Sequence, residues 1–416
     1  MARFAYSAFL YLITPLIWLR LLWRARRQPE YLRNIGERYG FYGEPVAENL
    51  IWVHAVSVGE TRAAQPLIEG LQARWPDHRI LLTGMTPTGR EAGREVYGER
   101  VLQAYLPYDY PGAVDRFFRC FSPAFGVLME TEVWPNLLAA AKRHNVPVVL
   151  ANARLSERSA RGYARVSALA EPAFSALAGV AAQTAADGER IGGLGARRIE
   201  VCGNLKFDVS PPAERIALGR SWRACLAARP VWLAASTREG EEALVLAAWR
   251  RVAVPGALLV LVPRHPQRFD AVAALLEQEK VPSRRRSAGL PEPEDQVWLG
   301  DSMGEMAAYY ALADIAFVGG SLVPLGGQNL IEAAACGCPV LVGPHTFNFR
   351  QATEDAIAAG AARRVADSAM LADEIGRLLE DGQALAAMRV ATERFTARHR
   401  GAAGRTLTAI EAFIAR

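Results

Sequence analysis

Short apolar runs alternate with helix-length amphipathic stretches along this chain from residue 50 onward. A turn rich in Gly, Ser or Pro follows each apolar run. This alternation is typical of a parallel, doubly wound sheet with helices on both faces, so an α/β fold is expected. The predicted strands are 51–55, 80–83, 101–106, 125–129, 146–151, 180–183 and 199–202 in the first half, and 231–235, 257–262, 297–299, 315–318 and 339–342 in the second.

The two series of strands predict two tandem Rossmann-like domains. A chain of 416 residues is long enough for two domains, and the stretch 209–230, with Pro211 and Pro212, separates the series. We therefore expect one domain over 28–210 and a second over 211–416, with a last helix that could pack back on the first domain. In such folds ligands bind at the carboxyl ends of the strands, which predicts an interdomain cleft.

The N-terminal segment predicts a membrane contact. Residues 4–19 carry no charge, and Arg24, Arg26 and Arg27 follow soon after. We interpret residues 1–27 as an apolar anchor helix, short for a bilayer, whose arginines meet anionic lipid. Because the basic residues follow the apolar run, the bulk of the chain is expected on the cytoplasmic side of the membrane. A core helix with a basic tail is the alternative.

Charge and cysteine content narrow the class of protein. The formal net charge is +5, and the seven arginines and two glutamates of residues 1–40 already give that value, so the remaining body is neutral overall. A nucleic-acid partner is therefore not expected. Five cysteines without paired C-x-x-C spacing do not make a disulfide framework.

Glu60 is the first candidate for chemistry. It follows the strand 51–55 and a turn through Ser57 and Gly59, at the start of a predicted helix. There a carboxylate can stabilise the helix dipole. It can equally take a proton from an acceptor hydroxyl at the cleft, and the spacing alone does not decide.

Two further groups are expected at the carboxyl ends of strands in the first domain. Glu130 and Glu132 leave a buried strand at a spacing that puts them on one face. Lys206 closes the first domain, where an ammonium could meet a phosphate or a developing negative charge. The structural alternatives are a Glu130 carboxylate that fixes the loops by accepting hydrogen bonds, and an ion pair of Lys206 with Asp208 or another carboxylate.

The second domain offers a possible nucleotide site. Arg264 follows a predicted strand and suits a phosphate or carboxylate, although it could also lie on a surface loop. The glycine-rich stretch 319–328 leads into a helix bearing Glu332; glycines let backbone approach a phosphate, and a carboxylate one turn into the helix can accept bonds from ribose hydroxyls. Residues 236–239 have the S-x-x-E form of a capping box that opens a helix.

Several motifs are absent from the sequence. It contains no D-x-D, H-E-x-x-H or G-x-x-x-x-G-K-[ST] pattern, and its six histidines do not cluster. Metal-dependent hydrolysis and P-loop ATPase chemistry are therefore disfavoured. We expect no metal site and no cofactor.

Six motifs together resemble one family, the 3-deoxy-D-manno-octulosonic acid (Kdo) transferases that act on lipid IVA. They are S-V-G-E at 57–60, M-E-T-E-V-W-P-N at 129–136, G-N-L-K-F-D at 203–208, P-R-H-P at 263–266, M-G-E at 303–305 and G-G-Q-N-L-I-E at 326–332. The resemblance covers almost the whole chain. One departure is Ala333, where relatives often carry proline.

The resemblance implies a GT-B fold and inverting, metal-independent transfer of Kdo from CMP-Kdo onto lipid IVA, in lipopolysaccharide core biosynthesis. By motif match, Glu60 would be the general base, and Glu130 and Lys206 would stabilise the transition state. The residues that would hold CMP are Pro263, Arg264, Met303, Gly304, Glu305, Asn329, Leu330, Ile331 and Glu332.

Other functions remain open at this point. One is a different GT-B enzyme, either a transferase that uses another nucleotide sugar or an epimerase. The other is an inactive, membrane-bound lipid-binding relative that keeps the fold.

Overall fold

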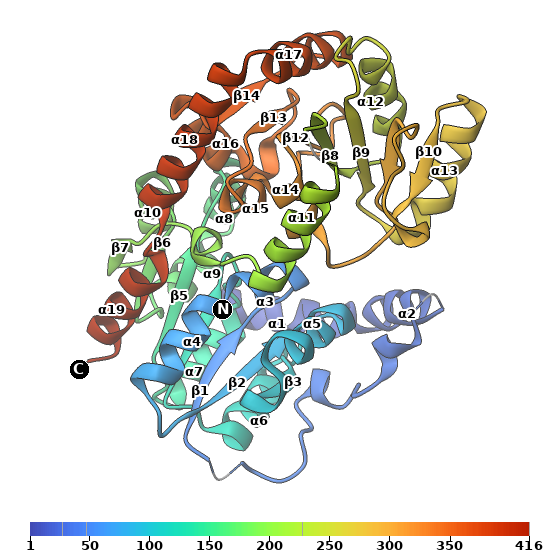
Figure 1. Ribbon diagram of the computed structural model, residues 1–416. Coiled ribbons are helices and arrows are strands. Elements are labelled where there is room, and N and C mark those ends of the chain that lie inside the picture. Colours follow the sequence, from blue (N-terminus) through green and yellow to red (C-terminus); the bar gives the residue numbers. More distant parts are fainter. Residues whose placement is uncertain (27, 47, 227, 416) are drawn as a thin grey trace. The chain divides into compact units, whose positions relative to one another are not determined.

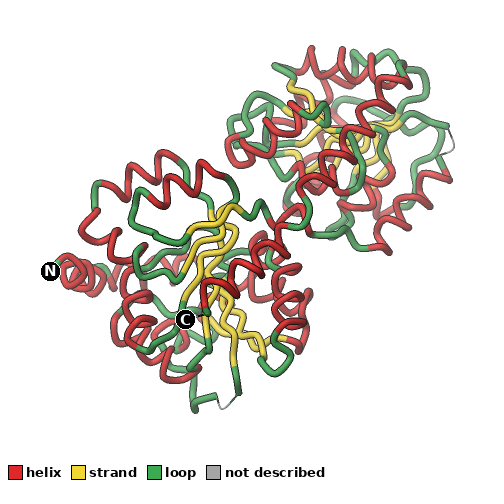
Figure 2. The backbone as a smooth tube through the Cα atoms, turned by 90° about the vertical axis from the view of Figure 1, so that its left-hand side faces the viewer, coloured by secondary structure: helices red, strands yellow, loops and turns green. Residues whose placement is uncertain are grey.

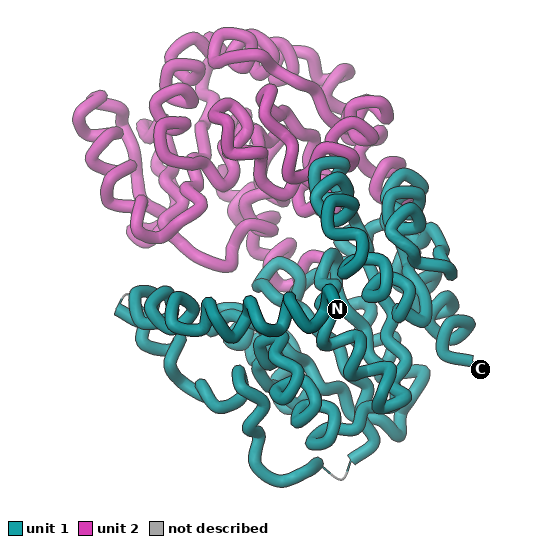
Figure 3. Tube along the Cα trace, turned by 180° about the vertical axis from the view of Figure 1, so that it is seen from behind, with its two compact units in different colours: residues 1–209, 401–416 teal, residues 210–400 magenta. Residues whose placement is uncertain are grey.

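The computed structural model describes residues 1–415 except 27, 47 and 227, and it divides into two compact units. Unit 1 comprises residues 1–209 and 401–416, and unit 2 comprises residues 210–400 (Figure 3). In each unit the strands form a sheet with helices packed around it (Figure 2). Each unit is described by itself below, with the element labels of Figure 1.

The sheet of unit 1 is parallel, with seven strands in the order β3-β2-β1-β4-β5-β6-β7 among the described residues. All seven strands lie where the apolar runs predict them. Their bounds are β1 Leu50–His54, β2 Arg79–Gly84, β3 Val101–Tyr105, β4 Phe125–Met129, β5 Val148–Ala153, β6 Gly179–Ala182 and β7 Ile199–Val201.

Helices cover both faces of this sheet. They are α1 Ala2–Leu12, α2 Thr14–Ala25, α3 Val58–Ala63, α4 Gln65–Arg74, α5 Pro87–Tyr97, α6 Pro111–Phe121, α7 Pro135–Arg143, α8 Glu157–Ala164, α9 Ser167–Phe174, α10 Ala185–Gly192 and α19 Ala402–Ile414. Short 3-10 turns lie at η1 Pro29–Leu32, η2 Glu37–Tyr39, η3 Gly98–Arg100 and η4 Leu205–Asp208.

Unit 2 repeats this architecture. Its parallel sheet has the order β10-β11-β9-β8-β12-β13-β14, with β8 Val231–Thr237, β9 Leu258–Pro263, β10 Ser283–Arg285, β11 Val297–Leu299, β12 Ile315–Val318, β13 Val340–Val342 and β14 Ala362–Arg364. Its helices are α11 Ala213–Cys225, α12 Glu241–Trp249, α13 Phe269–Gln278, α14 Met306–Leu312, α15 Leu330–Ala335, α16 Arg350–Ala358, α17 Ser368–Glu380 and α18 Gly382–His399, with η5 Pro266–Arg268, η6 Arg286–Ala288 and η7 Phe347–Phe349.

The two edge strands of the second sheet, β10 and β14, are absent from the sequence-based prediction. Their sequences, Ser-Arg-Arg and Ala-Arg-Arg, contain no apolar run. Edge strands commonly carry charged side chains, which discourage pairing with another chain. The prediction missed β10 and β14 because it searched for runs of apolar residues, which mark strands that are buried on both faces.

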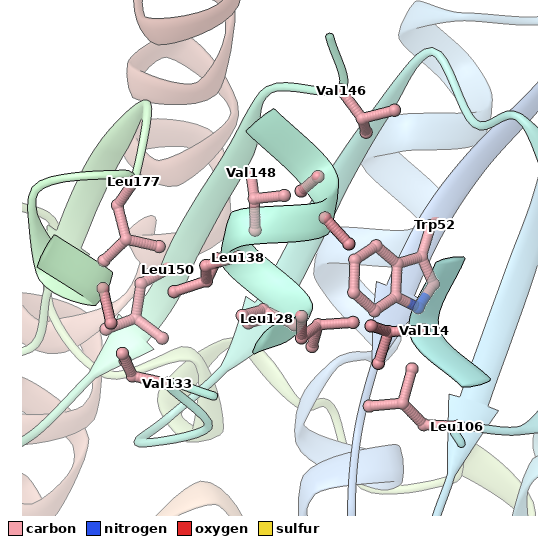
Figure 4. Packing of buried hydrophobic residues seen from close by; sticks show 14 of the residues in the cluster. Trp52, Leu106, Val114, Leu128, Val133, Leu138, Val146, Val148, Leu150 and Leu177 are labelled. Atoms are coloured by element: carbon pink, nitrogen blue, oxygen red, sulfur yellow. The ribbon is translucent and has the colours of Figure 1, made fainter. Parts of the chain in front are cut away.

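The core of unit 1 explains one glycine at the centre of its sheet. Trp52 of β1 is fully buried and makes an edge-to-face contact with Phe117 of α6, with the ring centroids 5.1 Å apart. A Cβ atom on Gly126, the β4 partner of Trp52, would lie 2.4 Å from the indole ring. Figure 4 shows Trp52 packed among aliphatic side chains that include Leu128. The large indole therefore occupies the space that a side chain at position 126 would need.

The last helix, α19, belongs to unit 1 although it follows α18 of unit 2. It contacts α4 and β6. The carboxylate of Asp208 accepts hydrogen bonds from the backbone N–H groups of Gly401 and Ala403, each at 2.6 Å, at the start of the helix. The chain thus closes the first domain with its own C-terminus.

The apolar N-terminal segment forms two helices, and the single anchor helix expected from the sequence is wrong in this respect. Helices α1 and α2 meet at Ile13 with a bend of 48°. Pro15 lies in the first turn of α2, and its missing N–H cannot continue the hydrogen bonding of α1. Among the described residues, no single helix is long and apolar enough to span a membrane, although this bent pair meets the length and composition requirements together.

Candidate active site

Glu60 lies in the first turn of α3, immediately beyond the carboxyl end of β1. Ser57 caps the helix, and its hydroxyl accepts a bond from the Glu60 N–H at 3.3 Å. The Glu60 carboxylate in turn accepts bonds from the backbone N–H of Val56 at 2.9 Å and the Ser57 hydroxyl at 3.2 Å. The helix-start interpretation of Glu60 is therefore correct, and these bonds hold the carboxylate in one position.

The environment of Glu60 favours its protonated form. Burial, together with the negative charges of Glu130 and Glu132, raises the pKa of Glu60 to about 7, although the bonds from Val56 and Ser57 oppose the shift. A carboxyl group with a pKa near neutral pH is suited to accept a proton and release it again. Structural capping and acid–base chemistry are thus compatible in this side chain.

Glu130 is held by two cations. Its side chain lies at the end of β4, is nearly buried, and accepts bonds from the Lys206 ammonium at 3.0 Å and the Arg154 guanidinium at 3.1 Å. Burial alone would raise the pKa of Glu130, but the two cations outweigh it and hold this pKa below its usual value. Glu130 also has a positive φ of 58°, an uncommon conformation for a residue with a side chain.

Lys206 forms the ion pair that its structural alternative allows, with a carboxylate other than Asp208. Lys206 pairs with Glu130, whereas Asp208 caps the start of α19. Asn152, at the end of β5, accepts a bond from the backbone N–H of Leu205 at 3.0 Å and so positions the turn that carries Lys206. The sequence analysis missed Asn152 and Arg154, although both are polar residues at the end of a predicted buried strand.

Glu132 remains in a less charged environment than Glu130. It accepts a bond from the indole N–H of Trp134 at 2.8 Å. Burial and the charge of Glu130 raise the pKa of Glu132 above its ordinary value. The first sheet therefore places three carboxyl groups at the ends of β1 and β4, and only Glu130 is neutralised by direct ion pairs among the described residues.

In unit 2 the expected nucleotide-binding residues also follow strands of one parallel sheet, in which β11 and β9 are neighbours and β8 separates β9 from β12. Arg264 follows β9, residues 303–305 follow β11, and Asn329 and Glu332 follow β12. The charges of Glu332 and Arg264 both act on the pKa of the buried hydroxyl of Tyr310, so each lies within electrostatic range of that side chain. These two residues are separated by 68 positions in sequence.

A group of arginines marks the loop after β9 as electropositive. Burial and the positive charges of Arg238, Arg264 and Arg268 lower the pKa of His265. The sequence analysis did not identify Arg238 and Arg268. Clustered guanidinium groups suit a phosphate, because each presents planar donors to its oxygen atoms.

The glycine-rich loop after β12 is held by a buried carboxylate. Glu241 is fully buried and accepts bonds from the backbone N–H groups of Gly320 at 2.6 Å, Ser321 at 3.1 Å and Leu322 at 3.0 Å. These three amides are therefore already occupied, which revises the expectation that the loop's backbone serves a phosphate directly. The loop is instead fixed from inside the protein.

The capping-box interpretation of residues 236–239 is wrong. Helix α12 begins at Glu241, its N-cap is Gly240, and Ser236 has a positive φ of 57°. The glutamate that matters here lies two residues beyond the motif, because Glu241 points inward to the loop after β12. Sequence spacing could not identify this long-range partner.

The remaining expected nucleotide contacts differ in accessibility. Met303 is exposed, and Glu305 accepts a bond from Ser302 at 2.6 Å and from Arg286 at 3.2 Å. Leu330 and Ile331 are each 1% exposed, so they could meet a nucleotide only through their backbone. Pro263 ends β9, and Gly304 has a positive φ of 75°. Asn329 caps α15, and its side-chain amide donates a hydrogen bond to the Glu332 carboxylate at 3.1 Å.

Within the part of the chain that the structure describes, no three His, Cys, Asp or Glu side chains gather in an arrangement that could hold a metal ion. Positive charge near the candidate sites comes from Lys206, Arg154 and the arginines around His265. Lys206 and Arg154 already pair with Glu130, and Arg268 pairs with Glu242.

Comparisons with known proteins agree for both halves of the chain. Residues 33–209 match the family model described as 3-Deoxy-D-manno-octulosonic-acid transferase (kdotransferase), and residues 267–395 match Glycosyl transferases group 1. A 3-deoxy-D-manno-octulosonic acid transferase of Bordetella pertussis is 47% identical over 99% of each chain. One of Haemophilus influenzae is 42% identical over 84% of each chain.

Solved structures support the fold. A glycosyltransferase from Rickettsia africae has a TM-score of 0.61 at 12% identity, covering 88% of this chain and 98% of its own. A UDP-GlcNAc 2-epimerase from Neisseria meningitidis has a TM-score of 0.61 at 15% identity, covering 88% and 100%. At such identities the likeness concerns the fold alone, and it confirms the predicted two-domain α/β architecture of the GT-B class.

Proposed function

This chain belongs to the Kdo transferase family of glycosyltransferases, and on that premise we propose that it transfers Kdo from CMP-Kdo to lipid IVA. The proposed reaction inverts the anomeric carbon and needs no bound metal. The observation that carries the proposal is the group formed by Glu60, Glu130 and Lys206 at the carboxyl edge of the first sheet.

Glu60 is the proposed general base. It removes the proton from a sugar hydroxyl of lipid IVA, and the freed oxygen forms a bond to the anomeric carbon of Kdo. The bond from that carbon to the phosphate oxygen of CMP breaks, and CMP leaves with the electron pair. The pKa of about 7 lets Glu60 accept the proton near neutral pH.

Lys206 is proposed to stabilise negative charge in the transition state. Glu130 holds the Lys206 ammonium at 3.0 Å, and Arg154 bonds the other oxygen of the same carboxylate. A cation fixed in this way does not have to reorganise when charge develops. Glu130 would thereby act mainly by placing Lys206.

The loops of unit 2 are proposed to hold CMP. Arg264, within the arginine group around His265, suits the phosphate, and Glu332 suits ribose hydroxyls. The expectation that donor and acceptor meet between the two domains stays a prediction. No cofactor and no nucleic-acid partner are part of the proposal.

The N-terminal helices are proposed to contact the inner membrane at its cytoplasmic face. Their inward side carries Ser7, which bonds Asn136, and the buried Leu21. Their outward side exposes large apolar groups: Phe4, Phe9, Tyr11, Leu12, Leu16, Leu19, Leu22 and Trp23. An exposed apolar face beside arginines suits anionic lipid. The assignment of residues 1–27 as the anchor stays a prediction.

The proposed reaction is tested by mass spectrometry of lipid IVA incubated with detergent-purified protein and freshly generated CMP-Kdo, with EDTA present. Wild-type protein should add one or more Kdo units. Glu60→Gln should lose turnover while keeping its affinity for CMP, because the amide cannot take a proton. Glu69→Gln, which changes an exposed glutamate of α4, is the control and should behave as wild type.

Three outcomes would contradict the proposal. Product formation by Glu60→Gln at the wild-type rate would remove the base assignment. Failure of the wild type in EDTA, with rescue by a divalent metal, would refute metal independence. Thermal protection by UMP rather than CMP would indicate a different nucleotide sugar, because a bound ligand stabilises the folded state.

A further inference from the structure

Unit 1 carries a groove of about 520 Å³ between α1, α7 and α9, and none of the catalytic residues assigned above is among those that line it. These three helices contact one another in pairs, and they are labelled near the N-terminus in Figure 1. The volume lies in the range of sites that bind small molecules and lipid chains. It is therefore large enough to hold part of a ligand.

The walls of the groove are apolar and made of small side chains. Pro135 and Ala139 lie on one face of α7, and Leu169, Pro172 and Ala176 come from α9 and the residue pair that follows it. Small side chains on the facing surfaces of two helices leave space between them. An aliphatic chain would remove these surfaces from water.

The polar part of the groove is positively charged. Arg3, Lys142 and Arg143 line it, and no aspartate or glutamate does. Arg143 lies 3.7 Å from Asp115, but among the described residues no carboxylate comes within 4.0 Å of the Arg3 or Lys142 side-chain nitrogens. The charge of Arg3 does act on the buried carboxyl of Asp109, whereas Lys142 forms no ion pair among the described residues. Apolar walls beside such cations complement an anionic amphiphile.

One end of the groove is close in sequence to the candidate active site, because Pro135 lines it and lies three residues after Glu132. Pro135 begins α7 directly after the loop that carries Glu130 and Glu132. The nine residues of α7 span about 13 Å, and Lys142 and Arg143 lie at the far end. A ligand that extends from the carboxylates along α7 would therefore bring an anionic group to these cations.

We propose that this groove binds a phosphorylated and acylated part of the acceptor lipid, with Lys142 and Arg3 facing phosphate and the apolar walls facing an acyl chain. The proposal rests on the proposed function, in which the acceptor is lipid IVA. It commits to the acceptor rather than to bulk membrane phospholipid, because the lining residue Pro135 begins the helix that directly follows the loop carrying Glu130 and Glu132.

The test compares Lys142→Glu and Ala139→Trp with wild type in the full-length protein, and Arg197→Glu, an exposed charge reversal of unit 1 outside the groove, is the control. We expect Lys142→Glu to raise the KM for lipid IVA at least tenfold, with kcat and the KM for CMP-Kdo within twofold of wild type. Ala139→Trp should raise the same KM by filling the groove. Phosphatase-treated lipid IVA should reduce the difference between Lys142→Glu and wild type.

Two further measurements separate the possible failures. Binding to phosphatidylglycerol vesicles should be the same for Lys142→Glu and wild type; a loss that matches the KM increase would assign the groove to membrane phospholipid and overturn the proposal. The affinity for lipid IVA, measured directly in detergent, tests whether the groove binds the lipid even if no transfer occurs. Wild-type affinity in both groove variants would refute the groove, whereas absence of transfer by wild type would refute the proposed function alone.

Discussion

Replacing Glu60 with glutamine should make the protein more stable, even though it should abolish turnover. The side chain is buried near Glu130 and Glu132, and its pKa is raised from 4.5 to about 7. Ionising Glu60 in the folded protein therefore costs free energy that the unfolded chain does not pay. Glutamine keeps an oxygen that can accept the bond from Val56 but has no charge to bury.

The sign and size of the stability difference between Glu60→Gln and wild type follow from proton linkage. Between pH 4.5 and 7 the folded state holds more protons at Glu60 than the unfolded state, so the wild-type free energy of unfolding falls as the pH rises. One pKa unit corresponds to about 1.4 kcal/mol, so the full effect is about 3 kcal/mol above pH 7. Between pH 5 and pH 8 the advantage of Glu60→Gln over wild type should grow by about 2.5 kcal/mol.

Urea unfolding followed by tryptophan fluorescence at pH 5, 6, 7 and 8 measures this difference directly. Glu69→Gln, an exposed substitution in α4, should show no such pH dependence. A Glu60→Gln variant that is less stable than wild type at pH 8 would refute the reasoning. So would a stability difference that stays constant with pH, because the ionised Glu60 would then carry no burial cost.

Two further substitutions test the groups that hold the site. Glu241→Gln should weaken CMP binding at least tenfold in calorimetry, because the bonds that Glu241 accepts from three backbone amides order the glycine-rich loop. Glu277→Gln, which changes an exposed side chain of α13, is the control and should leave CMP binding unchanged. Unchanged CMP affinity in Glu241→Gln would contradict that role. Lys206→Met should raise the pKa of Glu130 and lower kcat about 100-fold, with the affinity for CMP unchanged. Lys280→Met, which changes an exposed lysine of unit 2, is the control and should leave the pKa of Glu130 and kcat unaltered. A normal kcat in Lys206→Met would remove the proposed charge stabilisation.

The positions of several candidate residues could be predicted, because all strands of a parallel sheet end at the same edge. Side chains at the carboxyl ends of parallel strands lie at one edge of the sheet, so Glu60 after β1 and Glu130 after β4 were expected at that edge. That β1 and β4 are neighbours was decided by the tertiary structure. The pairing partner of Glu130 was not predictable, because Lys206 is 76 residues away along the chain. Helix spacing and motif form carry no information on contacts over such separations.

The sequence by itself determined the alternation of buried strands and helices, because strands covered on both faces must be apolar throughout. It also determined the order of the motifs along both domains. Only the tertiary structure decided how α1 and α2 break at Ile13, and which carboxylate holds the glycine-rich loop. The physical reason is that the residue types of a short stretch indicate whether it is buried. The partner of a buried charge depends instead on which distant segments the fold brings within hydrogen-bonding distance.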